Sequence, residues 1–211
     1  LNCRKSNQKR STYFSIIQKT HKIHITEKQI KVLEELLKKD VYIISAPSLN
    51  ISTEDKIMES SYFYMPYLSE NIIGSKQLKT FKFRSIFDEE DDVDFFRMEF
   101  AIKRNENELK NKFDQYVFQN MNSSISFAPS SPIEKIQVLT YKYIYESTNP
   151  TIESVKVDYD DALLFFQENG KRFMLACVHS CTSYSQFIRN DTTINEKIKD
   201  LYIRKEIKND R

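Results

Sequence analysis

Glycine is scarce in this sequence. Only Gly74 and Gly170 occur in 211 residues, against a usual share of roughly 7%. Because the two stand far apart, the sequence contains no P-loop, no G-x-G-x-x-G turn and no G-x-S-x-G nucleophile elbow. The scarcity of glycine therefore argues against nucleotide-binding folds built on glycine-rich loops, and against the α/β-hydrolases.

Long apolar runs are also missing. The longest runs, such as residues 173–178, have about the length of a strand. A membrane-spanning helix needs roughly 20 consecutive apolar residues. We therefore expect no spanning helix in this sequence.

Signals for catalysis are few. The sequence has three histidines, His21, His24 and His179, although histidine is the most frequent general base in enzymes. Ser45 and Ser48 stand in the segment S-A-P-S, which carries no nucleophile motif. Without a coherent catalytic set, the sequence predicts that the protein is not an enzyme.

Neither sign of charge dominates. The chain has 32 Lys and Arg against 30 Asp and Glu, a net charge of +2, which predicts no nucleic-acid partner. The charge is unevenly distributed, however. Residues 1–39 hold ten basic and three acidic side chains, whereas residues 88–99 hold seven acids and one base, Arg97.

The residues that are present are typical of a globular protein. Hydrophobic residues make up 40% and charged residues 29% of the chain, and 15 Phe and 12 Tyr supply the aromatic content. Much of that aromatic content lies in alternating runs, which favour antiparallel strands. We therefore predict an α+β fold with antiparallel sheets and about three helices.

Helices are expected at three places. The first begins at Thr26, because T-E-K-Q has the capping-box spacing and an apolar face of helical spacing follows it. The second is expected over residues 106–119. The third begins at Thr193 in T-I-N-E and runs to about Glu206.

Strands and hairpins fill most of the remaining chain. Asn169-Gly170 is the strongest hairpin turn signal, because both residues tolerate a positive φ. The acidic segment 87–94 joins two alternating runs and is expected to form a hairpin loop. The expected strands are residues 11–17, 41–45, 61–68, 79–87, 94–102, 134–146, 152–159, 162–168 and 171–180.

The domain organisation has two interpretations. Residues 1–10 read as a polar N-terminal tether, followed by a single α+β domain over residues 11–211. Alternatively, that domain consists of two similar strand-strand-helix lobes, residues 11–120 and 133–211. The Ser- and Pro-rich segment 121–132 would then be the linker.

The cysteines and histidines suggest a metal site or a disulfide. Cys177, His179 and Cys181 alternate, and with His21 and His24 they could supply a tetrahedral zinc site. The spacing is not a common one for zinc, and a flat strand places residues i and i+4 about 13 Å apart. A Cys177–Cys181 disulfide is the alternative, but it requires a turn there. In a third interpretation Cys177 is an ordinary core residue. We predict no bound metal and no cofactor.

The acidic run is the main candidate contact surface. It fails as an EF-hand loop, because Val93 stands where glycine is needed and no glutamate closes the loop. A solvated hairpin tip, a weakly held cation and a docking patch for a basic protein partner all stay open. The residues of this patch are Asp88, Glu89, Glu90, Asp91, Asp92 and Asp94.

A second acidic segment, V-D-Y-D-D at residues 157–161, holds Asp158 and Asp160 on one strand face. Paired carboxylates are common acid–base machinery. With no partnering histidine or lysine nearby in the sequence, we interpret them as turn and edge residues.

Leu1-Asn2-Cys3 resembles the end of a bacterial lipoprotein signal, in which the cysteine is acylated and becomes the first residue of the mature protein. The family prefers a small residue before the cysteine, and Asn2 departs from that preference. The resemblance implies lipidation of Cys3, with the polar tether following it. It also implies a location in the periplasm or on the outer membrane surface.

Together these features predict a non-enzymatic binding protein of the bacterial cell envelope, attached to the membrane through its N-terminal lipid alone. A small domain with an acidic hairpin looks like an immunity protein that neutralises a secreted toxin. The expected partner is therefore a protein. The alternative is an intracellular Cys/His metal-binding module or an enzyme of unrecognised type.

Overall fold

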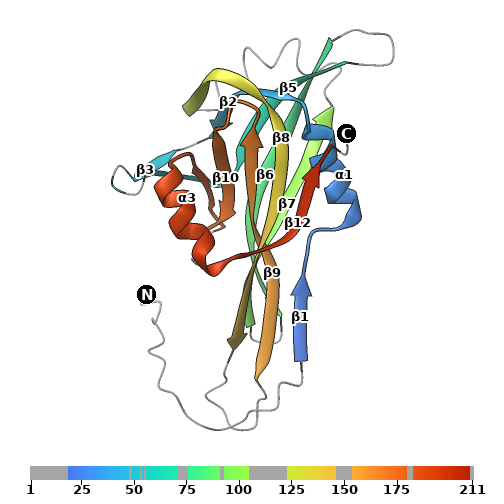
Figure 1. Ribbon diagram of the computed structural model, residues 1–211. Coiled ribbons are helices and arrows are strands. Elements are labelled where there is room, and N and C mark those ends of the chain that lie inside the picture. Colours follow the sequence, from blue (N-terminus) through green and yellow to red (C-terminus); the bar gives the residue numbers. More distant parts are fainter. Residues whose placement is uncertain are drawn as a thin grey trace.

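The computed structural model describes residues 19–47, 49–52, 54, 56–70, 76–90, 93–104, 123–145, 154–179 and 183–209. Strands dominate this part of the chain and form a sheet curled into a half-barrel (Figure 1). The prediction of an α+β fold with three helices is therefore wrong in its proportions, because the protein is mostly β. Antiparallel pairing, which the sequence did predict, holds through almost all of the sheet.

The elements follow one another along the chain as β1 (Lys19–Ile23), α1 (Glu27–Leu36), β2 (Asp40–Ala46), β3 (Asn50–Ser52), β4 (Ile57–Ser60), β5 (Phe63–Glu70), β6 (Lys76–Glu90), β7 (Val93–Arg104), β8 (Ser123–Tyr145), β9 (Val155–Gln167), β10 (Arg172–Cys177), β11 (Ser185–Ile188), α3 (Asp191–Lys197), the 3-10 turn η2 (Ile198–Asp200) and β12 (Tyr202–Lys208). None of the helices in these ranges is long and apolar enough to cross a membrane.

The sheet runs in the order β3-β4-β11-β10-β9-β8-β2-β5-β6-β7. β8 connects the two parts of the sheet. Its first part pairs with β2, and its second part pairs with β9. β12 adds to β8, and β1 adds to β9 as the one parallel pair among the described strands. Strands from both halves of the sequence thus share one sheet, where two separate lobes were the alternative expectation.

Helix α1 forms where the sequence predicts it. Thr26 is the N-cap, and the reciprocal bonds of a capping box join it to Gln29. Ile30, Leu33 and Leu36 are buried on one face. The helix ends at Leu36, and Lys38, with a φ of 63°, lies in the turn that leads to β2.

Both predicted hairpins are present. Asn169 and Gly170 turn the chain from β9 to β10, and Gly170 has a φ of 78°, a conformation that other residues adopt at a cost. β6 and β7 form the second hairpin in continuous register from Lys79–Arg104 to Glu90–Val93. Residues 87–90 and 93–94 of the acidic segment are therefore part of the strands.

The C-terminal region differs from the prediction. Helix α3 begins at Asp191 with Asn190 as its cap, and it ends at Lys197. Residues 202–208 form strand β12 instead of a helix, because Ile207 is buried there and the strand pairs with β8. T-I-N-E itself lies inside α3, but from Tyr202 onward pairing with β8 gives a strand where the helix was expected to continue.

The segment expected to be a linker is described from Ser123 onward, and there it is a strand. From Ser123 onward this segment is the start of β8, and Ser123 pairs with Ala46 of β2. The tether at residues 1–10, the first expected strand at 11–17 and the expected helix at 106–119 lie outside the described residues.

The main core fills the concave side of the half-barrel. Phe165 and Phe173 stack at 4.6 Å between ring centroids, and Phe81 contacts Phe165 edge-on. Such aromatic pairs add about 1 kcal/mol each beyond the apolar area that they bury. A second cluster lies on the convex side under α3, so β9 and β10 are buried on both faces. Burial on both faces accounts for the continuous apolar runs at residues 162–166 of β9 and 173–177 of β10.

Candidate functional site

The β6–β7 hairpin carries the predicted acidic patch. Near its tip Asp88 pairs with Arg97 across the strands at 3.6 Å, and farther from the tip Arg84 pairs with the directly opposite Glu99. These ion pairs neutralise the middle of the hairpin face. Glu89 and Asp94 are exposed at the tip and form no ion pair with any described residue. Uncompensated negative charge is therefore concentrated at the tip.

The register of the hairpin places Glu89 directly opposite Asp94. Two like charges at opposed positions of an antiparallel pair destabilise the sheet. The backbone here is nevertheless firmly held. Val93 is 1% exposed, and the hydroxyl of Tyr143 on β8 donates a hydrogen bond to the Asp94 carbonyl oxygen. The backbone at Val93 and Asp94 is therefore anchored by the core and by β8.

The remaining residues of the patch are only partly described. Asp91 and Asp92 lie outside the described residues, as does the side chain of Glu90. The structure therefore positions three of the six predicted acids, which are Asp88, Glu89 and Asp94.

A pocket of about 350 Å³ lies beside the same hairpin. Residues 97–101 of β7 form one wall, and residues from α1 and from the segment before it form the other. Gln29 of α1 spans the two walls, because its Nε2 donates to the Met98 carbonyl oxygen at 3.3 Å. The volume falls in the range of natural ligand pockets.

The two aspartates expected at a turn or edge are instead buried in the middle of β9. Asp158 is 6% and Asp160 is 2% exposed. Asp160 accepts a fork of two bonds from Arg204, at 2.7 and 2.6 Å, and further bonds from Thr140 Oγ1 and the Ile25 amide. All of these partners come from other elements, so Asp160 ties β12, β8 and the entry to α1 together.

Asp158 has a similar structural role. The Tyr202 hydroxyl donates to its Oδ1 at 2.6 Å, and His24 Nε2 lies 3.0 Å from the same oxygen. Burial raises the pKa of Asp158, but the hydrogen bonds from Tyr202 and His24 and the charge of Lys142 outweigh it. The pKa of Asp158 therefore lies below its usual value, and the carboxylate stays ionised at neutral pH.

Asp161 and His179 form a third polar contact, on the concave side of the sheet. His179 Nε2 lies 2.6 Å from Asp161 Oδ1 and 3.1 Å from the Tyr159 hydroxyl. The rings of Phe96 and Tyr141 pack against the imidazole, with distances of 5.3 and 5.4 Å between ring centroids. The second oxygen of Asp161 is buried without a hydrogen-bond partner among the described residues.

An Asp–His pair can orient a general base, but a nucleophile would have to stand beside it. Cys177 is the cysteine on the neighbouring strand, and it is fully buried. Burial, and then the charge of Asp161, raise the pKa of this thiol above its usual value. A thiol in that environment stays protonated and unreactive.

The proposed zinc ligands do not gather in the part of the chain that the structure describes. His21 lies on β1, opposite Val157, and His24 contacts Asp158, whereas His179 contacts Asp161. Across the described ranges, no three His, Cys, Asp or Glu side chains are placed to hold a metal ion. Cys181 and Cys3 lie outside the described residues, so the disulfide and the lipidation stay predictions.

Sequence reasoning missed the partners of the buried aspartates. Arg204 and Tyr202 were assigned to a helix, and their 44-residue separation from Asp160 and Asp158 hides the contacts. One available signal was the alternation of Tyr202, Arg204 and Glu206, which is compatible with a strand.

Comparison with known proteins found no match, whether to a protein family, to a curated protein or to a solved structure.

Proposed function

We propose that this protein is a non-enzymatic binding protein of the bacterial cell envelope, and that the acidic hairpin tip contacts a basic surface of a protein partner. A secreted toxin neutralised by this contact is the leading candidate for that partner. The proposal concerns the surface formed by Asp88, Glu89 and Asp94.

One observation carries the proposal, namely the opposed pair Glu89 and Asp94 on a backbone held by Val93 and Tyr143. Like charges facing each other weaken the sheet, so folding alone gives no reason for the pair. A basic partner would relieve this repulsion and would be attracted from a distance. The buried aspartates support a non-enzymatic role, because the bonds of Asp158 and Asp160 hold strands together.

The envelope location rests on the resemblance at Cys3 and is part of the same proposal. Its test is metabolic labelling of the source bacterium with an alkyne-tagged fatty acid. We expect label on the wild-type protein and none on Cys3→Ser. Equal labelling of the two proteins, or no labelling of either, would remove the lipid anchor from the proposal.

The binding surface is tested with a partner recovered by crosslinking intact cells that express the tagged full-length protein. The partner is then purified, and its affinity is measured calorimetrically for the wild type and for the double variant Glu89→Lys, Asp94→Lys. We expect at least tenfold weaker binding by the variant, and wild-type binding that weakens as salt increases.

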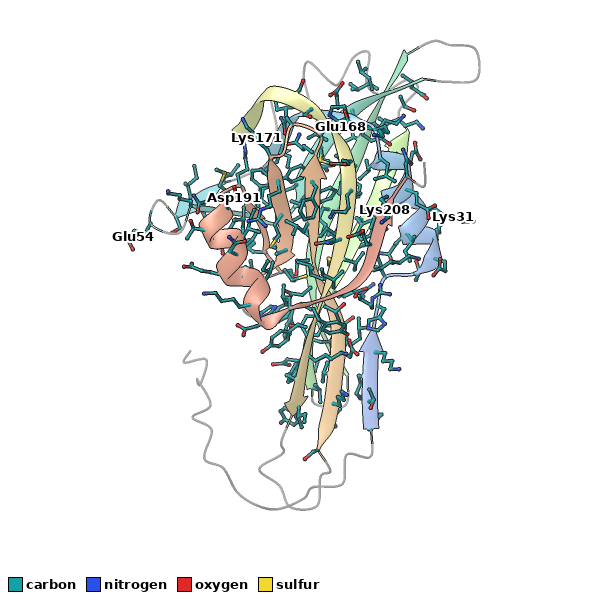
Figure 2. All side chains as sticks on the ribbon, in the orientation of Figure 1. Lys31, Glu54, Glu168, Lys171, Asp191 and Lys208 are labelled. Carbon is teal, nitrogen blue, oxygen red and sulfur yellow. The ribbon has the colours of Figure 1, made fainter. Side chains whose placement is uncertain are left out.

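Glu54→Lys is the matched control. Glu54 is an exposed acid at the β3–β4 end of the sheet, and Figure 2 shows it far from Lys31 of α1. Each substitution changes the charge by two units, so the control carries half of the change in the double variant, and it should bind like the wild type. Recovery of no protein partner, or equal affinity of the double variant and the control, would overturn the proposal.

A further inference from the structure

In the part of the chain that the structure describes, the outer edge of β7 has no strand partner. β7 ends the path of the sheet, and no described strand pairs with it on the side away from β6. An exposed edge presents main-chain donors and acceptors and is a template for a further strand. Many proteins protect such edges, so an open one needs an explanation.

The pairing of β6 and β7 shows which main-chain groups face this edge. The amides of Ser85 and Phe87 on β6 donate to Ser185 and Ser183, away from β7. In an antiparallel ladder both residues of such a pair turn their main-chain groups outward. Met98, the partner of Ser85, therefore presents its N–H and C=O at the free edge.

Gln29 marks the place that a further strand would occupy. Its side-chain amide donates to the Met98 carbonyl oxygen, and this is a bond that the N–H of a neighbouring strand would make. The same Gln29 side chain also accepts from the Thr26 amide through Oε1. It can therefore give up the bond to Met98 and keep its role in the capping box.

The pocket at this edge has room for an extended segment. Residues 97–101 of β7 line it, and at about 3.3 Å per residue they span ~13 Å of edge. Val32 and Ile25 add apolar surface on the opposite wall. Such a groove suits alternate side chains of a strand whose main chain bonds to β7.

We propose that an extended segment of a protein partner adds to β7 as a strand, in the groove between β7 and α1. The groove begins at Arg97 of β7, three residues along the strand from the exposed Asp94 of the acidic tip. The segment therefore carries a basic residue at the end that lies near Asp94. This inference rests on the proposed function, since it describes how the same partner extends its contact beyond the tip.

The test uses a displayed library of random seven-residue peptides, selected on the immobilised wild-type protein. The peptides recovered are synthesised with a fluorophore, and their affinities are measured by fluorescence polarisation. Ala101→Tyr is the blocking variant, because Ala101 is an exposed, small side chain that lines the groove. Lys82→Tyr is the matched control, because Lys82 lies opposite Ala101 on β6 but does not line the groove.

We expect basic peptides whose affinity falls at least tenfold on Ala101→Tyr and stays within twofold on Lys82→Tyr. Methylation of alternate peptide amides should weaken binding similarly, because it removes the donors of a strand. Bound peptide should also slow the hydrogen exchange of the Met98 amide. Recovery of no peptide, or equal binding to the two tyrosine variants, would overturn the inference.

The two proposals can fail separately. Loss of partner binding on charge reversal at Glu89 and Asp94, with full binding retained by Ala101→Tyr, would leave the tip contact standing and remove strand addition. Full binding retained by the charge-reversed protein would instead remove the tip contact.

Discussion

Asp160 accepts four hydrogen bonds although it is 2% exposed, and two of them come from Arg204. A buried charge is tolerated only where its partners replace water. Removing one partner leaves the charge uncompensated, and that costs far more than the pair itself contributes. The stability of the β9 region therefore depends on single long-range side chains.

Arg204→Ala should lower the free energy of unfolding by about 3 kcal/mol, because it removes the two hydrogen bonds that the guanidinium donates to the Asp160 carboxylate. Urea denaturation measures the change. Glu168→Ala is the control, since its ion pair with Lys38 is exposed and such pairs contribute less than about 1 kcal/mol. Equal losses for both variants would contradict the role given to Asp160.

Tyr143 should make the protein sensitive to alkali. Burial first, and then the charge of Asp94, raise the pKa of Tyr143 from 10.0 to about 12. The folded state thus favours the neutral phenol, so the stabilisation is complete below pH 10 and is lost as pH rises toward 12. Between these values the urea midpoint should fall less steeply for Tyr143→Phe than for the wild type. Parallel curves for the two proteins would refute this assignment.

At the scale of elements, the β6–β7 hairpin combines a rigid backbone with an unfavourable arrangement of charge. The opposed Glu89 and Asp94 weaken the hairpin, while Tyr143 of β8 bonds to its backbone and Val93 is buried in the core. Surfaces selected for binding often carry such a cost to stability. A stability measurement without any partner can therefore detect the cost.

Glu89→Thr should raise the free energy of unfolding by about 0.5 kcal/mol, because it removes the repulsion from Asp94 and introduces a good strand former. The same substitution at Glu54, an exposed acid with no facing acid in the strand pairing, should change stability less. The two are compared by their urea midpoints. No gain, or a loss, for Glu89→Thr would mean that the opposed charges do not destabilise the hairpin.

Local signals in the sequence predicted the elements that depend on local contacts. The Thr26 capping box and the Asn169-Gly170 turn are formed within a few residues, and both are present. β12 could not be predicted in this way, because its strand state depends on pairing with β8, more than sixty residues earlier. The free edge of β7 was also hidden, since an edge is defined by the order of strands in the sheet.

At the scale of the whole molecule, strands from both halves of the chain are interleaved in one sheet. β8 pairs with β2 and with β9, and residues 123–132 of the segment expected to separate two lobes are part of β8. Neither half of the chain can complete this sheet alone.

Unfolding should therefore be a single cooperative transition. Urea curves followed by far-UV circular dichroism and by tyrosine fluorescence should coincide, as two-state unfolding requires. Two separate transitions would show that the halves 11–120 and 133–211 are independent units after all.

The pairing of β1 with β9 has a consequence for how the protein is made. Lys19 pairs with Val155, so the first described strand finds its place only after most of the chain has been synthesised. Contacts between residues so distant in sequence slow folding, because a long loop must close before they form. The β1–β9 pair is therefore expected to form late in folding, after the strands that pair with nearer neighbours in the sequence.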